Sequence, residues 1–190
     1  SDHGEMVGTH GQVEMRTPYE ESSRIPLLVR APWLTKSQRR VSGNLGQIDF
    51  VPTLLDLLGQ FVPNHLPGES RGDVLRGLAD LRDNDVFIQH NGIGDRDLTS
   101  AASSHMMSPE RVRQLNWLKT VPWRSVVTSD RWKLTLCAAD QGELFDLNND
   151  PSETTNLFDA AEYSDRVRWM VARLRLWQSE VGDTAPLPGV

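Results

Sequence analysis

The chain has 190 residues, of which 38% are hydrophobic, so it can bury a core and is not a disordered segment. Its 20 lysines and arginines against 26 aspartates and glutamates give a formal net charge of -6, which makes nucleic acid a poor partner. No stretch approaches the roughly 20 apolar residues that a membrane span requires, so we expect no membrane partner. The single cysteine, Cys137, excludes an internal disulfide and a metal site built on several thiolates.

The chain opens with the string SDHGEMVGTHG, in which polar side chains precede any predicted helix or strand. Asp2 and His3 offer a carboxylate oxygen and an imidazole nitrogen side by side, and such a pair could hold a metal ion. Gly4 allows a sharp backbone turn and leaves room beside both side chains. An isolated pair of this kind is more often a hydrogen-bonded turn than a metal site, so both interpretations stay open at this point.

The apolar run at residues 25–29, ended by Pro32, is typical of a buried strand in a parallel sheet. A polar loop directly before such a strand would follow an earlier strand, which this sequence does not contain. We therefore expect Ser1 to be the point at which a larger α/β domain is cut. The adjacent Glu20 and Glu21 lie between the two features, and Arg24 close by offers a salt-bridge partner, so we expect a structural role for these acids.

The next predicted elements are a helix and a strand. The string GQIDFVPTLLDLLG predicts a short amphipathic helix that Asp49 can cap and Gly59 ends. Its apolar face consists of Val51, Leu54, Leu55 and Leu58. The string DVFIQHNG predicts a strand at residues 86–89. Residues 94–122 are polar with weak periodicity, which predicts a long surface excursion that shapes a pocket.

The last part of the chain predicts a small sheet and its covering helix. Residues 125–128, 132–137 and 143–146 alternate between turns and are expected to form an antiparallel meander. The string NDPSETTNL predicts a tight turn and a following cap, with no chemistry. Residues 164–180 have apolar side chains at three- and four-residue spacing, which predicts a helix packed on the meander.

Five of these strings occur together in a fixed order: SDHGEMVGTHG, TPYEESSRIPLLVRAP, IDFVPTLLDLLG, RWKL and ELFDLNNDPSETTNL. In this order the chain resembles the C-terminal part of a type I sulfatase, in the alkaline-phosphatase superfamily. The resemblance implies an α/β fold, the C-terminal part of an α/β/α sandwich followed by a small antiparallel sheet with a C-terminal helix. It further implies that residues 1–122 belong to the catalytic α/β domain, truncated at its N-terminus, and that residues 123–190 form a small subdomain.

The resemblance also implies a site. Asp2 and His3 take the positions of two ligands of a divalent cation, usually calcium. The family's nucleophile is a formylglycine made from Cys or Ser in a C-x-P-x-R or S-x-P-x-R motif, and neither motif occurs in this chain. We therefore expect the nucleophile upstream and an inactive fragment here. The implied substrate is a small-molecule or carbohydrate sulfate ester, and a homo-oligomer stays open.

One position departs from the family pattern. Most members carry a sulfate-binding lysine five residues after the second histidine of the opening string, and counting from His10 this position holds Met15. A thioether cannot balance the charge of a sulfate. Either Arg16, one residue on, reaches the same space, or activity is weakened, redirected or lost. We take Arg16 and His10 as candidate substrate-binding residues.

Two alternatives to a sulfatase stay open. The first is a phosphonate monoester or phosphodiester hydrolase of the same superfamily, the nearest variant of the sulfatase reaction. The second is a non-catalytic, sulfatase-like protein, because Met15 replaces the usual lysine.

Overall fold

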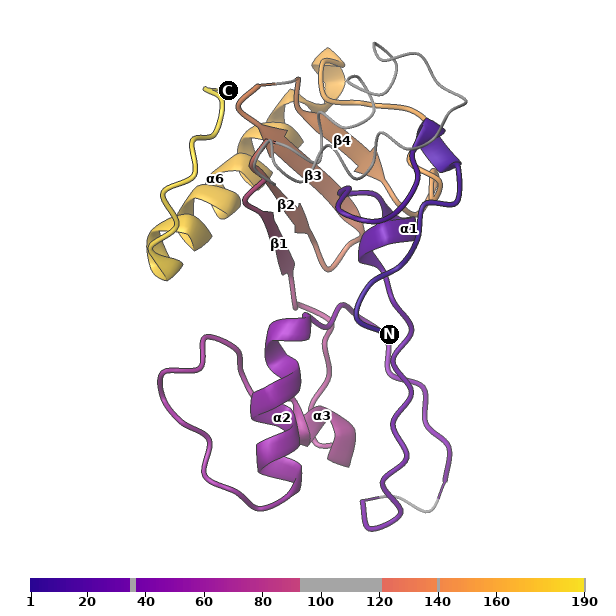
Figure 1. Ribbon diagram of the computed structural model, residues 1–190, viewed down its shortest axis with the longest axis vertical. Coiled ribbons are helices and arrows are strands. Elements are labelled where there is room, and N and C mark those ends of the chain that lie inside the picture. Colours follow the sequence, from indigo (N-terminus) through magenta and orange to yellow (C-terminus); the bar gives the residue numbers. More distant parts are fainter. Residues whose placement is uncertain (35–36, 93–120, 140, 190) are drawn as a thin grey trace. The chain divides into compact units, whose positions relative to one another are not determined.

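The computed structural model describes most of the chain: residues 1–34, 37–92, 121–139 and 141–189 (Figure 1). The predicted surface excursion at residues 94–122 therefore lies almost entirely outside the described residues. Within the described part, no helix is both long and apolar enough to cross a membrane.

The chain forms two compact units, each assembled from segments that are distant in the sequence. The sheet unit consists of residues 1–27, 88–126 and 132–190. The helical unit consists of residues 28–87 and 127–131. The division of the whole protein into domains at residue 122 stays a prediction.

A four-stranded sheet with the order β1-β2-β3-β4 is the centre of the sheet unit (Figure 1). Its strands are β1 Val86–His90, β2 Trp123–Val127, β3 Trp132–Cys137 and β4 Glu143–Asp146. β3 and β4 pair antiparallel, with Leu134 opposite Leu144. The predicted meander is confirmed, and the strand predicted at residues 86–89 extends the same sheet. β2 and most of β3 are buried along their length, including Cys137.

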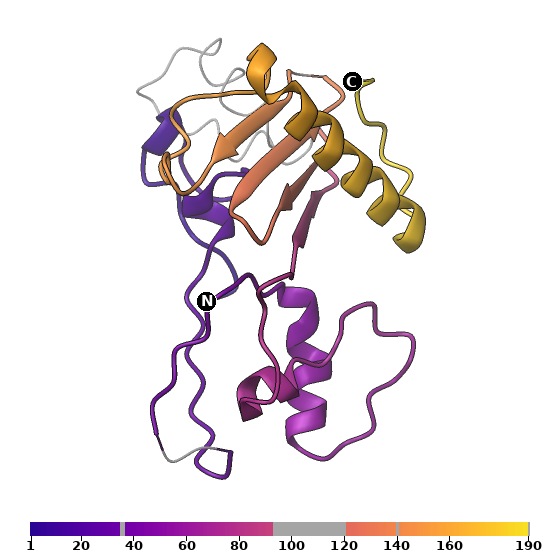
Figure 2. The same cartoon turned by 180° about the vertical axis from the view of Figure 1, so that it is seen from behind.

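The helix α6 Ser164–Val181 lies across one face of this sheet and packs on β3 (Figure 2). Its buried residues are Val167, Met170, Val171 and Leu174, which follow the three- and four-residue spacing of an amphipathic helix. The helix ends at Gly182, whose φ of 67° is the left-handed conformation that glycine adopts without strain. The predicted covering helix is therefore confirmed.

Two helices organise the helical unit, α2 Phe50–Leu57 and α3 Gly72–Arg76. Asp49 precedes α2, but the prediction that its side chain caps this helix is wrong. The buried carboxylate instead accepts hydrogen bonds from the Glu69 amide, at 2.9 Å, and from Arg71 Nε, at 2.8 Å. Asp49 therefore joins the start of α2 to the loop before α3, because its carboxylate accepts two hydrogen bonds from that loop and no capping hydrogen bond from its own helix.

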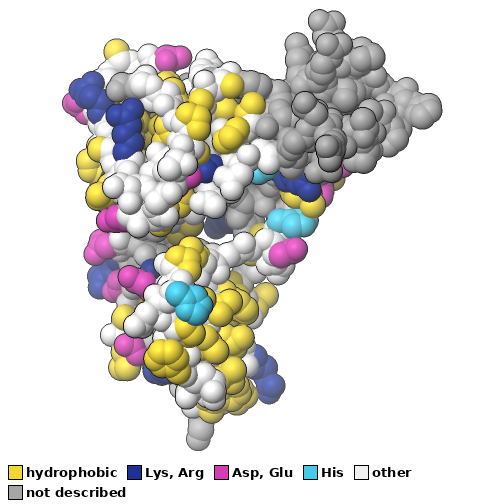
Figure 3. Space-filling model, turned by 60° about the vertical axis from the view of Figure 1, so that its left-hand side comes forward, with side chains coloured by type: hydrophobic (Ala, Val, Ile, Leu, Met, Phe, Trp, Pro, Cys, Tyr) yellow, Lys and Arg dark blue, Asp and Glu magenta, His cyan; other side chains and the backbone are white. Residues whose placement is uncertain are grey.

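The apolar face predicted for α2 is largely exposed in the described structure. Val51, Leu54 and Leu58 are all exposed, and Figure 3 shows that hydrophobic side chains reach the surface of the molecule in many places. The buried residues of α2 are Pro52 and Thr53, on the side that meets α3. The helix is therefore confirmed, but in the described part of the chain no element covers its apolar stripe.

The prediction of a strand at residues 25–29 is wrong for this structure. The segment forms no helix or strand, and Leu28 is 93% exposed, with Leu27 and Val29 about half exposed. A single strand is stable only when neighbouring strands satisfy its backbone and cover its side chains. No strand of the described chain pairs with this segment, so its apolar sequence alone does not make it a strand here.

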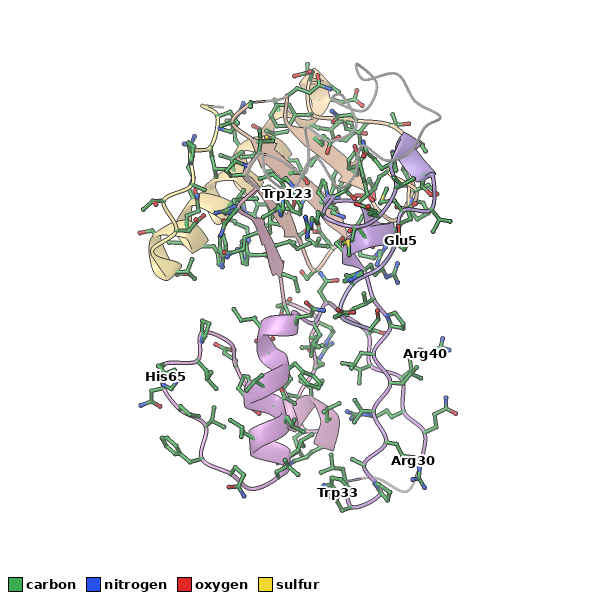
Figure 4. The ribbon with its side chains drawn as sticks, in the orientation of Figure 1. Glu5, Arg30, Trp33, Arg40, His65 and Trp123 are labelled. Atoms are coloured by element: carbon green, nitrogen blue, oxygen red, sulfur yellow. The ribbon has the colours of Figure 1, made fainter. Side chains whose placement is uncertain are left out.

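A buried ion pair joins the end of the chain to the sheet, near the buried Trp123 at the start of β2 (Figure 4). Arg124 donates from Nε and Nη2 to the two carboxylate oxygens of Asp183, at 2.8 and 2.7 Å. The same guanidinium donates to the His90 carbonyl at 2.6 Å and to Asn91 Oδ1 at 2.8 Å. Hydrogen bonds from Arg124 hold the pKa of Asp183 well below its usual range.

Replacing Asp183 with asparagine should lower the free energy of unfolding by about 3 kcal/mol at neutral pH, because the Arg124 guanidinium then stays buried without a counter-ion. The folded-state pKa of Asp183 lies below the ordinary value of 3.8, so the pair contributes its full stability above that pH and loses it as the pH falls further. Urea unfolding between about pH 3 and about pH 7 measures both effects. An identical acid dependence in the wild type and the variant would contradict this assignment.

Candidate functional site

The two predicted metal ligands lie next to each other at the start of the sheet unit. His3 Nε2 is 3.8 Å from Asp2 Oδ2, and the Asp2 side chain is 90% exposed. His3 Nδ1 lies 2.8 Å from the Gly4 carbonyl, which can only accept, so Nδ1 is the donor and Nε2 is the nitrogen that offers a lone pair in the neutral ring. A hydrogen bond from its own backbone and the neighbouring His3 lower the pKa of the Asp2 carboxyl. Two lone-pair donors therefore lie side by side and face outward.

This pair fits part of a cation site. A carboxylate oxygen and an imidazole whose other nitrogen donates to a backbone carbonyl are typical metal ligands. Calcium takes about 6–8 oxygen-rich ligands, so two side chains cannot complete its coordination. In the described ranges, no group of three or more His, Cys, Asp or Glu side chains is placed to hold a metal ion. Any such site would need further ligands.

Gly4 fixes the pair to the short helix α1 Glu20–Ser23. Its amide donates to the Ser22 carbonyl at 2.8 Å. A Cβ atom on Gly4 would lie 1.8 Å from the Glu21 carbonyl oxygen, which is far inside van der Waals contact. Glycine is therefore required here for a close backbone approach.

His10 lies in a strained loop beside α1. Its φ of 53° is left-handed, and its ring stacks on Tyr19 with 3.9 Å between centroids and 5° between planes. Tyr19 in turn donates from its hydroxyl to Glu143 Oε1 on β4, at 2.8 Å. His10 Nε2 is buried without a hydrogen-bond partner among the described residues. The structure thus brings His10 to the sheet through Tyr19.

The two residues at the position of the missing lysine differ in exposure. Met15 is half-buried, whereas Arg16 is exposed with a φ of 78°. Arg16 forms no hydrogen bond or ion pair within the described part of the chain, so its guanidinium can bind an anion. Neither residue is brought into contact with Asp2 or His3 by any interaction between described side chains.

The sequence interpretation missed a buried ion cluster beneath α1. Of the two adjacent acids, Glu20 pairs with Arg24, at 3.7 Å. Its closer partner is Lys133 on β3, whose Nζ lies 3.2 Å from Glu20 Oε1 and 3.0 Å from Glu153 Oε1. Lys133 and the Glu153 side chain are fully buried, and burial raises the pKa of Glu153. The one available signal was a lysine inside the otherwise uncharged strand string WKLTLC.

The predicted turn of the NDPSETTNL string is confirmed. The Asp150 carboxylate accepts hydrogen bonds from the Thr154 hydroxyl at 3.0 Å and from the Thr155 amide at 2.8 Å. Glu153, within this turn, has a φ of 52° and points into the unit instead of toward solvent. The string therefore carries a buried charge as well as a turn.

Comparisons with known proteins identify sulfatases as similar proteins. The family described as "N-sulphoglucosamine sulphohydrolase, C-terminal" matches residues 8–91. The N-acetylglucosamine-6-O-sulfatase of Bacteroides thetaiotaomicron is 28% identical over 189 residues, which cover 98% of this chain and 30% of the relative. The uncharacterized sulfatase YidJ of Escherichia coli is 32% identical over 168 residues, which cover 87% of this chain and 28% of the relative.

Solved structures agree with the fold. The structure of BT4656 in complex with its substrate D-glucosamine-2-N,6-O-disulfate matches with a TM-score of 0.75 and 26% identity, over 98% of this chain and 34% of that one. The phosphonate monoester hydrolase of Agrobacterium radiobacter matches with a TM-score of 0.67 and 25% identity, over 95% of this chain and 34% of that one.

The chain belongs to the type I sulfatase family and corresponds to the C-terminal portion of its members. The predicted fold class, an alkaline-phosphatase-like α/β fold with a small antiparallel sheet and a C-terminal helix, is confirmed. The chain spans about 30% of the length of the curated relatives given above.

Replacing Gly4 with alanine should lower the free energy of unfolding by about 1–3 kcal/mol, because the new methyl group would overlap the Glu21 carbonyl and push the backbone away. Gly46→Ala is the matched control, since its Cβ would meet Ile48 Cγ2 at an ordinary 3.5 Å. Urea unfolding of both variants compares them directly. Equal stability of the two would show that the approach of Gly4 to α1 is not tight in solution.

Proposed function

We propose that the whole protein hydrolyses sulfate esters, with a divalent cation, calcium, held in part by Asp2 and His3. The observation that supports this proposal is the side-by-side placement of these two side chains, with His3 Nε2 3.8 Å from Asp2 Oδ2, at the two positions that the sequence resemblance assigns to cation ligands. The relatives named sulfatases support the reaction class. Hard oxygen donors with a single imidazole favour calcium over softer metals.

In this proposal the chain supplies binding and orientation. Asp2 and His3 would hold the cation, and the Gly4 contact with α1 would fix the direction of both side chains. When bound, the cation supplies Lewis-acid polarisation of the sulfate and stabilises the activated nucleophile. The nucleophile, a formylglycine, would come from residues outside this chain, because neither of its sequence motifs occurs here.

We infer a sulfated carbohydrate as the substrate class. One relative is named for a sulfated N-acetylglucosamine, and one structural neighbour was solved with a disulfated glucosamine as its substrate. Arg16 would replace the missing lysine at Met15, because its guanidinium is exposed and unpaired within the described chain. A guanidinium can bind two sulfate oxygens at once, which an ammonium group cannot do with the same geometry.

A second candidate function is the hydrolysis of phosphonate monoesters. The observation that favours it is the similarity to the Agrobacterium radiobacter enzyme of that name. Both substrates present a tetrahedral oxyanion to a cation, so the residues of this chain would serve either reaction in the same way. Parallel assays on an aryl sulfate and an aryl phosphonate distinguish the two.

Asp2→Ala in the whole protein should lower kcat/KM for sulfate-ester hydrolysis by about 100-fold or more, because loss of a charged ligand loosens the cation. Glu5→Ala is the matched control, since Glu5 is another exposed carboxylate of the same segment (Figure 4). Assays with an aryl sulfate and with N-acetylglucosamine 6-sulfate, each with and without added calcium, measure the effect. Unchanged rates for Asp2→Ala would remove the metal assignment and the proposal with it.

Arg16→Gln should lower kcat/KM by about 10- to 100-fold, because a positioned cation stabilises the charge that develops on the sulfate. Met15→Lys in the Arg16→Gln background should restore part of this loss, since it returns an ammonium group to the family's usual position. The same assays measure both variants, with Met15→Lys alone as the reference. A large gain from Met15→Lys alone, with no loss in Arg16→Gln, would assign the sulfate to position 15 and not to Arg16.

A further inference from the structure

The buried ion cluster contacts both ends of α1. Lys133 Nζ pairs with Glu20 at the first residue of α1 and donates to Ser23 Oγ at its last, at 3.3 Å. Glu153 uses its second oxygen, Oε2, to accept the backbone amide of Glu20 at 2.6 Å. Tyr19, just before α1, donates its hydroxyl to Glu143 on β4. Both ends of this helix are therefore fixed by side chains of the sheet and of the turn that follows it.

α1 cannot set its own position. It has four residues, and a helix of this length has no stability of its own in water. Its place in the sheet unit must come from tertiary contacts, and the charged contacts are those with Lys133 and Glu153. Because these groups are buried, their interaction is much less weakened by water and salt than a surface ion pair would be.

A short path leads from this cluster to the candidate metal pair. The Ser22 carbonyl of α1 accepts the Gly4 amide at 2.8 Å, and the Glu21 carbonyl lies against the Gly4 Cα. The Gly4 carbonyl in turn accepts a hydrogen bond from His3 Nδ1, which orients the imidazole. Each step is a direct contact between neighbouring groups.

We propose that Lys133 and Glu153 are positioning residues for the Asp2–His3 pair, acting through α1 and Gly4. This inference rests on the proposed function for one point alone, namely that the Asp2–His3 pair binds a cation. Lys133 and Glu153 themselves touch neither the cation nor the substrate. They hold the backbone from which both ligands extend, so that the two donors keep one separation and one direction.

The alternative is that the cluster only stabilises the fold and does not position the metal pair. A second buried ion pair in the same unit serves as a control, because it should affect stability alone. Arg124 and Asp183 are similarly buried, but they make no contact with α1 among the hydrogen bonds of the described chain. They bond instead to His90 on β1, Asn91 in the loop after β1, Trp123 on β2 and Gln178 on α6. Arg124→Met should therefore destabilise the protein without acting on α1. Lys133→Met and Glu153→Gln should act on both stability and the metal pair.

The test compares Lys133→Met, Glu153→Gln and Arg124→Met in the whole protein. Hydrogen exchange of peptides that cover Gly4, without added cation, reports how firmly this segment is held. Isothermal titration with calcium reports the affinity of the pair. We expect the first two variants to speed exchange around Gly4 by about 10-fold or more and to weaken calcium binding by about 10- to 100-fold. Arg124→Met should lower the melting temperature with neither effect.

The proposal would be overturned if Lys133→Met and Glu153→Gln left either the exchange rate around Gly4 or the calcium affinity unchanged. It would also be overturned if Arg124→Met changed both quantities as much as these two variants do. Glu153→Gln removes a charge but keeps an oxygen that can accept a hydrogen bond from the Glu20 amide. The test therefore rests on this variant if Lys133→Met does not fold. If the wild type binds no calcium, the proposed function fails. The exchange comparison then still decides whether Lys133 and Glu153 hold the Asp2–His3 segment.

Discussion

A buried ammonium group between two carboxylates is the contact on which the sheet unit depends. Lys133 is fully buried on β3, and a lone charge in such a place would be strongly unfavourable. Glu20, 113 residues before Lys133 in the sequence, and Glu153, 20 residues after it, offset this charge. Burial raises the pKa of Glu153 in this cluster. Moving β3 away would leave the fully buried Glu153 carboxylate without its cation.

The sequence predicted those elements whose signals are local. The meander and α6 follow from alternation, turns and helical spacing within short windows, and the structure confirms them. The segment at residues 25–29 has an equally clear apolar signal but forms no strand, because pairing depends on neighbours that a local window does not contain. Asp49 likewise has a good capping position, yet Glu69 and Arg71, some 20 residues later, take its carboxylate. Competition between near and distant partners is decided by tertiary structure.

The candidate site shows the same division. Asp2, His3 and Gly4 were identified from one string, because adjacent donors followed by glycine are visible in the sequence. The reason for Gly4 was not visible, since it is the approach of the Glu21 carbonyl, 17 residues further on. Lys133 and Glu153 were missed altogether as parts of this arrangement. A strand lysine and a turn glutamate have ordinary solvent-exposed explanations until the fold buries them side by side.

The geometry of the pair explains why such distant support is useful. Asp2 and His3 lie in a segment without helix or strand, and holding each backbone residue of such a segment in one conformation costs about 1–2 kcal/mol. If the cation itself had to order this segment, its binding free energy would be less favourable by about 1–2 kcal/mol for each residue that it fixed. On the proposed function, the contacts from β3 and the NDPSETTNL turn through α1 to Gly4 order the segment during folding instead. The two exposed donors then need only their remaining ligands, and the binding free energy is not spent on the backbone.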